Sequence, residues 1–155
     1  MSETRDAVDP DIDVRVAVQR RELLRGHGAV LAVIAAGGGV GAVARYGVGL
    51  WLPTTAGRFP WGTFAIDVSG CFLIGVLMVL ITEVWSAHKL IRPFLGVGLL
   101  GGFTTFSTYA NEIRGLLKPG TVDVGLLYLF GTLLGALLAV VLGVWATRAF
   151  VGRRA

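Results

Sequence analysis

Residues 98–112 read GLLGGFTTFSTYANE and lie in the middle of a hydrophobic segment. Three glycines, four Ser and Thr hydroxyls and an asparagine stand where a membrane-spanning helix usually carries Leu and Val. Unpaired backbone amides and carbonyls are costly in lipid, so a helix broken at membrane depth survives only where protein or water covers the break. We therefore expect this stretch to interrupt a transmembrane helix.

The composition of the whole chain agrees with a membrane protein. The 155 residues are 54% hydrophobic and only 15% charged, with a mean hydropathy of +0.73. A soluble domain carries about a quarter of its residues as charges. Cys71 is the single cysteine, which excludes a disulfide framework, and we expect it to be a small packing residue. The net charge of +4 comes from chain ends and loops, so nucleic-acid binding is not expected.

Hydrophobic segments long enough to cross a bilayer core of about 30 Å predict four transmembrane helices. They cover residues 28–51, 58–85, 92–117 and 122–148. The predicted fold is an all-α membrane protein with a broken third helix. Residues 1–28 are expected to form a charged, disordered cytoplasmic tail with helical character next to the membrane. Residues 29–148 form the predicted four-span domain, and residues 149–155 form a basic C-terminus.

The basic residues near the span ends are distributed unevenly, nine on one side against three on the other. The first group comprises Arg15, Arg20, Arg21, Arg25, Lys89, Arg92, Arg148, Arg153 and Arg154, and the second comprises Arg58, Arg114 and Lys118. Because Lys and Arg accumulate on the cytoplasmic side, this count places both termini in the cytoplasm.

Gly101 and Gly102 allow the backbone to leave helical geometry within the third segment. Such a break frees carbonyl oxygens, which are suitable ligands for a hard cation such as Na⁺. Alternatively, the small residues serve close helix packing while Thr and Ser form hydrogen bonds between helices. The stretch by itself leaves both interpretations open.

Aromatic and hydroxyl side chains recur at helical spacing. Phe106 and Tyr109 lie three residues apart and are flanked by hydroxyl residues. An aromatic ring has a positive edge, so such rings can hold a small anion without a formal positive charge. Tyr128 and Thr132, at i and i+4, add two donors to one face of the last segment. Helix packing is the alternative role for each residue.

Ionisable groups at membrane depth are costly and indicate function. Asp67 is the deepest, and Arg45 lies near the outer end of the first span. Glu83 and Glu112 lie near span ends, where solvation is easier. The sequence has no Cys/His metal set and no nucleophile with a paired base, so no enzyme activity is expected. The glycine string GGGVG at 37–41 falls inside a span, and we interpret it as a packing motif rather than a phosphate loop.

Three stretches resemble the small bacterial fluoride channels of the Fluc (CrcB) family. They are GGGVGAVARY at 37–46, GTFAIDVSGCFLIG at 62–75 and GGFTTFSTYANE at 101–112. The resemblance extends over residues 29 to about 147. It implies a passive fluoride exporter in the plasma (inner) membrane that limits cytoplasmic fluoride, built as an antiparallel, dual-topology dimer with two pores.

The resemblance also implies roles for individual residues. A structural Na⁺ that is not transported would be held by the backbone carbonyls of Gly101 and Thr104, two from each subunit. The pore aromatics would be Phe106 and Tyr109. The remaining implied pore residues are a polar track on the last span and a vestibule arginine, namely Tyr128, Thr132 and Arg45.

Three positions depart from the family pattern. Asp67 stands where Asn is usual, Tyr109 replaces the second pore Phe, and Ala136 replaces a frequent Ser. An ionised Asp67 would repel fluoride, whereas a protonated carboxyl could donate a hydrogen bond as Asn does. With the uneven charge count, these departures favour a heterodimer with a paralogue over a homodimer. They also leave open a non-conducting structural partner. A small drug–proton antiporter is disfavoured because the first span lacks a carboxylate.

Overall fold

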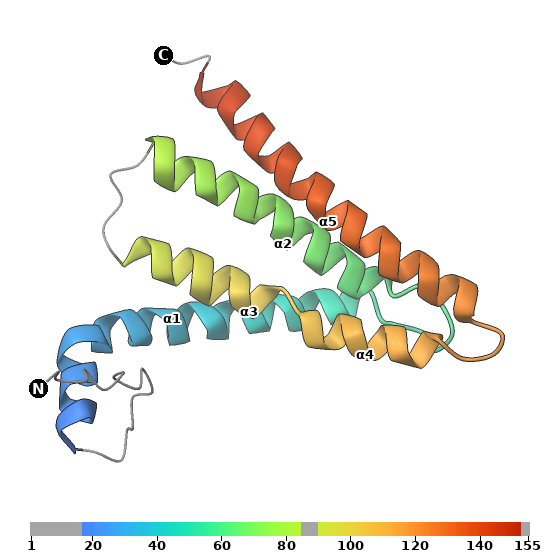
Figure 1. Ribbon diagram of the computed structural model, residues 1–155, viewed down its shortest axis with the longest axis horizontal. Helices are drawn as coiled ribbons and strands as arrows, with labels where there is room; N and C mark the ends of the chain where they lie inside the picture. The colour runs from blue at the N-terminus through green and yellow to red at the C-terminus, as the bar shows by residue number, and fades with distance from the viewer. Residues whose placement is uncertain (1–16, 85–89, 153–155) are drawn as a thin grey trace, which may run out of the picture.

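The computed structural model describes residues 17–84 and 90–152, and this part of the chain is helical and contains no strand. Figure 1 shows the elements in order. They are α1 (Ala17–Trp51), α2 (Trp61–Val79), the π-helical η1 (Leu80–Val84) and η2 (Pro93–Leu100), α3 (Gly101–Phe103), α4 (Phe106–Leu116) and α5 (Val122–Val151).

Three helices in the described part are long and apolar enough to cross a membrane. They cover Gly28–Trp51, Trp61–Val84 and Val122–Val151, with mean hydropathies of 1.6, 2.5 and 2.4. These ranges agree with three of the predicted spans, and the chain is accordingly a multi-pass membrane protein. The remaining segment, 92–117, is divided among η2, α3 and α4, so its crossing of the membrane stays a prediction.

The helices at the two chain ends extend beyond the predicted spans. Helix α1 already begins at Ala17, inside the segment for which disorder was predicted. The residues that follow Ala17 are mostly good helix formers, so the long apolar helix continues into them at little cost. Helix α5 likewise runs to Val151, past the predicted boundary at residue 148. Arg15, Lys89, Arg153 and Arg154 lie outside the described residues.

The helices pack as two groups. In one, α2 packs against α5, and in the other, α1 packs against η2 and α3. Glycines occupy the closest approaches. A side chain at Gly41 would overlap the backbone of Leu99, and one at Gly102 would overlap the backbone of Gly38. The glycine string in the first span is therefore a packing motif, as the sequence suggested.

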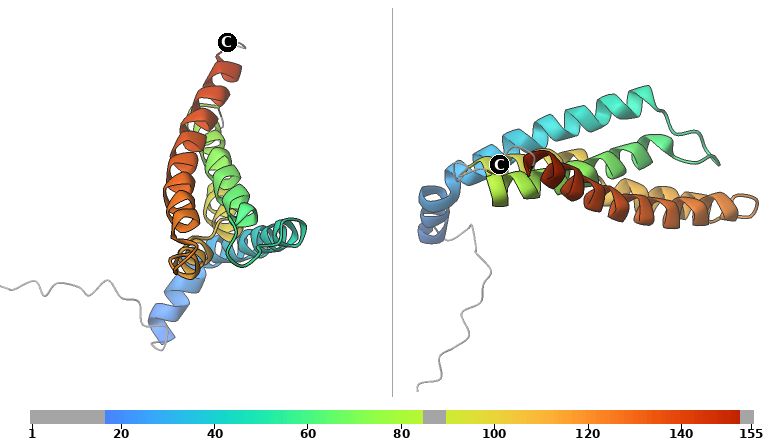
Figure 2. Two further views of the ribbon diagram at one scale, coloured as in Figure 1. Left: turned by 90° about the vertical axis from the view of Figure 1, so that its right-hand side faces the viewer. Right: turned by 90° about the horizontal axis from the view of Figure 1, so that it is seen from above.

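Few apolar side chains are buried within the single chain. Along α5, large apolar residues such as Leu127, Leu138 and Trp145 are 64%, 63% and 69% exposed. The two further views in Figure 2 show the elements splayed rather than closed into a bundle. These surfaces require lipid or another protein surface to cover them.

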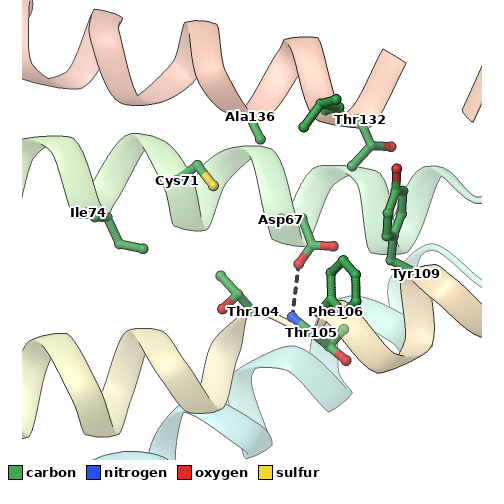
Figure 3. A pocket seen from close by; sticks show the side chains of 10 residues that line it. Asp67, Cys71, Ile74, Thr104, Thr105, Phe106, Tyr109, Thr132 and Ala136 are labelled. Carbon is green, nitrogen blue, oxygen red and sulfur yellow. Dashed lines mark hydrogen bonds between the residues drawn. The ribbon is translucent and has the colours of Figure 1, made fainter. Parts of the chain in front are cut away.

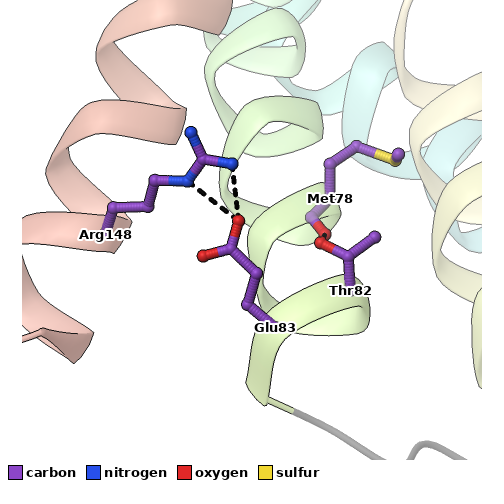
Figure 4. A network of polar contacts seen from close by, with 4 residues as sticks. All are labelled: Met78, Thr82, Glu83 and Arg148. Carbon is purple, nitrogen blue, oxygen red and sulfur yellow. Dashed lines mark hydrogen bonds and ion pairs between the residues drawn. The ribbon is translucent and has the colours of Figure 1, made fainter. Parts of the chain in front are cut away.

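An ion pair links the ends of η1 and α5 (Figure 4). Arg148 Nε and Nη2 donate to Glu83 Oε1 at 2.8 and 2.6 Å. The two side chains are 61% and 38% exposed, so solvent screens the pair and it contributes little to stability. It is a weak, solvent-exposed contact between the two helix ends.

The backbone between α3 and α4 is extended rather than helical. Thr104 has φ −77° and ψ 159°, and Thr105 has φ −151° and ψ 104°. The side chain of Thr105 then caps α4, because its Oγ1 accepts from the Thr108 amide at 3.3 Å. We call residues 104–105 the helix break, and it lies beside the site described next.

Candidate functional site

A cavity of about 240 Å³ lies between α2, α5 and the helix break (Figure 3). We call it the central cavity. Its lining combines a carboxylate, a thiol, three threonines, two aromatic rings and aliphatic side chains. The residues are Asp67, Cys71, Ile74, Thr104, Thr105, Phe106, Tyr109, Thr132, Leu133 and Ala136. Of the predicted pore residues, the structure brings together Asp67, Phe106, Tyr109 and Thr132 here.

Asp67 connects α2 to the helix break. Its Oδ1 accepts a hydrogen bond from the Thr105 backbone amide at 2.9 Å, drawn as the dashed line in Figure 3. The extended backbone leaves this amide without a helical acceptor, so the side chain of residue 67 supplies one. Asp67 is therefore a structural as well as an electrostatic element of the cavity.

Thr132 lines the central cavity and carries a buried hydroxyl without a partner among the described residues. The residue is 5% exposed, and its Oγ1 is buried without a hydrogen-bond partner in the described part of the chain. An unsatisfied buried polar group costs about 1–3 kcal/mol. No described protein group therefore competes for this hydroxyl if a species bound in the cavity reaches it.

The two aromatic residues at the cavity differ in how they are held. Phe106 is 79% exposed, and its ring centroid lies 5.9 Å from that of Tyr109, at an interplanar angle of 49°. The Tyr109 hydroxyl donates to the Leu129 carbonyl at 2.7 Å. Since this hydroxyl is already used, Tyr109 contributes its ring to the cavity rather than a free donor.

Tyr128 does not line the central cavity. It is fully buried, and its hydroxyl donates to Glu112 Oε2 at 2.7 Å. The hydroxyls of Thr63 and Thr54 donate to Glu112 Oε1 at 3.0 and 3.3 Å. The sequence suggested only easy solvation for Glu112, so its role as a three-hydroxyl acceptor was missed. The signal available was its spacing of three residues after Tyr109 on one helical face.

Arg45 is half-buried on α1 and does not line the central cavity. Within the described part of the chain, its guanidinium makes no hydrogen bond or ion pair. Cys71, by contrast, was expected to be a packing residue and lies in the cavity lining, one helical turn after Asp67. That spacing could have identified it.

The predicted Na⁺ ligands fit the chemistry of that ion in part. Thr105 donates its amide to Asp67 rather than to the carbonyl of Gly101 four residues earlier. Within residues 17–84 and 90–152, the carbonyls of Gly101 and Thr104 accept no hydrogen bond outside regular helix. Neutral oxygens of this kind suit a hard cation. The same residues contain no cluster of three or more His, Cys, Asp or Glu side chains that could bind a metal.

Gly101 and Thr104 face different surroundings. Thr104 lines the central cavity, whereas Gly101 is exposed and does not line it. A Cβ on Gly101 would have the Gly96 carbonyl oxygen, at 4.0 Å, as its nearest neighbour. One chain thus offers two oxygens, and further ligands would have to come from outside it.

Comparisons with known proteins cover the whole of this site. A family model described as "CrcB-like protein, Camphor Resistance (CrcB)" matches residues 32–144. The fluoride-specific ion channel FluC 2 of Nocardia farcinica is 60% identical over 120 residues, which are 77% of this chain and 86% of that protein. FluC 1 of Streptomyces coelicolor is 55% identical over 135 residues, or 87% and 88% of the two chains. FluC of Chloroflexus aurantiacus is 43% identical over 120 residues, or 77% and 95%.

The matched range includes every residue of the central cavity, and the identities extend over most of the chain. The resemblance drawn from the three sequence stretches is therefore confirmed, and the chain belongs to the CrcB family.

Proposed function

We propose that this chain is a subunit of a fluoride-specific channel that lets fluoride leave the cytoplasm passively and so limits its toxicity. The unpartnered Thr132 hydroxyl beside the Phe106 and Tyr109 rings carries the proposal. A channel of this kind is not an enzyme. The names of the relatives, fluoride-specific ion channels, support the choice of ion.

Fluoride must exchange its hydration shell for protein donors on its way through the cavity. Thr132 donates one hydrogen bond, and the ring edges add positive electrostatic potential without a fixed positive charge. Neutral donors of this kind bind the ion without trapping it. The remaining apolar wall excludes water and strengthens each of these contacts.

Asp67 acts against anion passage when it is ionised. Two like charges a few Å apart in a low-dielectric cavity repel strongly. The Thr105 amide offsets part of this charge by donating to Oδ1. Fluoride passage past Asp67 then requires a protonated carboxyl, which can donate a hydrogen bond as an amide does.

The proposed assembly is an antiparallel, dual-topology dimer whose two pores lie in the contact between subunits. The exposed apolar surfaces of α1 and α5 and the exposed face of Gly101 support a second subunit. When bound, Na⁺ would supply a point of positive charge that holds four neutral carbonyl oxygens together. Gly101 and Thr104 of each subunit would contribute these oxygens, and this Na⁺ is structural rather than transported.

The favoured partner is a homologous subunit of opposite charge bias. Nine basic residues against three fix one orientation with both termini in the cytoplasm, so the chain cannot readily pair antiparallel with itself. The partner would supply Asn and Phe where this chain has Asp67 and Tyr109. The alternative is that this chain is a non-conducting structural partner, and Asp67 in the cavity lining favours that role for its own half of the pores.

Fluoride efflux from liposomes tests these assignments. The chain alone, a paralogue alone and both together are reconstituted and compared, with Asp67→Asn as a matched variant. We expect strong efflux from the mixture and a gain of efflux in Asp67→Asn, because the amide keeps the acceptor for Thr105 and removes the charge. Equal, fast efflux from the chain alone and from Asp67→Asn contradicts the heterodimer. Absence of fluoride efflux in every combination contradicts the channel assignment.

A further inference from the structure

A second cavity, of about 310 Å³, lies at the loop end of the chain, and we call it the loop-end cavity. It is separate from the central cavity and is formed by the loop before α2, the end of α4 and the loop after it. Its lining residues are Thr54, Thr55, Ala56, Gly57, Arg58, Pro60, Asn111, Glu112, Gly115, Leu116 and Lys118. Nothing in the pore assignment above uses this cavity.

Two cations from distant parts of the chain meet at this cavity. Arg58 and Lys118 lie 60 residues apart, and both are exposed. In the part of the chain that the structure describes, neither side chain makes a hydrogen bond or an ion pair. The only carboxylate in the lining, Glu112, already accepts from the hydroxyls of Thr54, Thr63 and Tyr128. The loop-end cavity thus carries a net positive charge that no described protein group pairs directly.

Polar residues extend from the loop-end cavity toward the central cavity. Glu112 lines the loop-end cavity and accepts from the buried Tyr128 hydroxyl with Oε2. Tyr128 lies one helical turn from Thr132, which lines the central cavity and whose buried hydroxyl has no partner in the described part of the chain. The two cations therefore lie at the outer end of a row of polar side chains that extends from Glu112 through Tyr128 to Thr132.

We propose that Arg58 and Lys118 form an anion-attracting mouth, which raises the local concentration of fluoride at the outer end of the pore and so eases its passage out of the protein. This inference rests on the proposed channel function. Like-signed charges around a low-dielectric hollow focus the field and raise the local concentration and entry rate of counter-ions. The mouth attracts small inorganic anions in general, and selection for fluoride takes place deeper in the protein.

The field at the mouth can be measured without any ion conduction. Thr55, which is exposed and lines the loop-end cavity, is replaced by Cys in a Cys71→Ser background. The reaction rates of an anionic and a cationic methanethiosulfonate reagent are then compared in proteoliposomes. We expect the anionic reagent to be favoured, and Arg58→Gln together with Lys118→Gln to lower this preference at least about threefold at low ionic strength. An unchanged preference overturns the proposal.

Arg114→Gln is the matched control for this measurement. Arg114 is exposed on α4, donates to Asn111 and does not line the loop-end cavity. Its removal changes the formal charge as much as each neutralising variant does. We expect a much smaller effect on the reagent preference. An effect as large as that of Arg58→Gln shows a general surface charge and overturns the assignment of a mouth.

Fluoride efflux through the channel gives the second readout. Neutralising both cations should slow efflux about two- to fivefold at about 0.01 M ionic strength, where the Debye length is about 30 Å. The difference should vanish near 1 M, where that length is about 3 Å. Slowing of the same size at every ionic strength indicates a folding defect and contradicts the mouth. Reagent preference without any fluoride efflux from the parent chain, alone or together with a paralogue, keeps the mouth and rejects the channel function, so the two failures are distinguishable.

Discussion

The Thr132 hydroxyl is the group whose removal separates pore function from folding most cleanly. It has no hydrogen-bond partner in the described part of the chain. Thr132→Val therefore removes no hydrogen bond within the protein and leaves stability unchanged or slightly higher. A lost hydrogen bond to an anion is worth about 1.5–3 kcal/mol, so fluoride efflux should fall by about one to two orders of magnitude. Stopped-flow or electrode recordings of efflux, with thermal unfolding in detergent, measure both effects.

Thr132→Ser is the control, because it keeps the hydroxyl and should retain most of the efflux. Equal efflux in Thr132→Val and the parent protein shows that the hydroxyl does not contact the ion.

Phe106 allows a similar separation for the ring edges. The side chain is 79% exposed in the single chain, so Phe106→Ile costs the subunit little packing. Ile keeps apolar volume but has no positive edge, and we expect a large loss of fluoride efflux with unchanged expression. Phe103→Ile, an aromatic replacement outside the cavity lining, is the control. The prediction fails when both variants conduct equally.

Residue-level reasoning from the sequence found the members of the site that repeat at helical spacing. Phe106, Tyr109 and Thr132 were identified in this way, and Asp67 was identified by its charge inside a span. The placement of Tyr128 and Arg45 outside the lining could not be foreseen. The placement of Tyr128 depends on tertiary contacts, because Thr54 of the loop before α2 and Thr63 of α2 meet Tyr128 at Glu112.

At the scale of elements, two adjacent glycines should respond differently to substitution. A Cβ on Gly102 would overlap the Gly38 backbone, so Gly102→Ala should push α3 away from α1 and destabilise the subunit by about 1–3 kcal/mol. Gly101 has open space around it, so Gly101→Val should leave the isolated subunit folded. It should nevertheless abolish assembly, because its exposed face is where the second subunit and the structural Na⁺ are proposed to lie.

Thermal unfolding in detergent measures the first effect, and chemical cross-linking or size-exclusion chromatography measures the second. Normal assembly of Gly101→Val, together with undiminished fluoride efflux in wholly Na⁺-free liposomes, contradicts the proposed Na⁺ site.

Element boundaries were predictable where length and hydropathy alone determine them. The helix ends at Trp51 and Trp61 agree closely with predicted limits because Pro53 and Pro60 restrict the backbone nearby. The π-helical η1 and η2 were not predictable. Their altered hydrogen-bond register depends on packing against neighbouring helices, which the local sequence does not encode.

At the scale of the whole molecule, the charge distribution predicts a single orientation. A C-terminal tag should be accessible only from the cytoplasm, because basic residues predominate on that side. Adding two lysines to the first loop, as in Thr55→Lys with Ala56→Lys, should shift part of the population to the opposite orientation. Protease protection or impermeant labelling in membrane vesicles measures the distribution.

A second variant, Thr121→Lys with Val122→Lys, adds two lysines at the end of another loop on the same predicted side of the membrane. It should also shift part of the population to the opposite orientation. A parent chain whose tag is found equally on both faces contradicts the fixed orientation and, with it, the preference for a heterodimer.

The contact between Asp67 and the Thr105 amide has a consequence for how duplicated subunits can diverge. The donor belongs to the backbone, and the acceptor is a single planar oxygen that aspartate and asparagine both possess. A gene copy can therefore exchange one for the other and change the charge of its permeation path while the helix break keeps its shape. The charge of the cavity and the shape of the helix break can therefore diverge independently at this position.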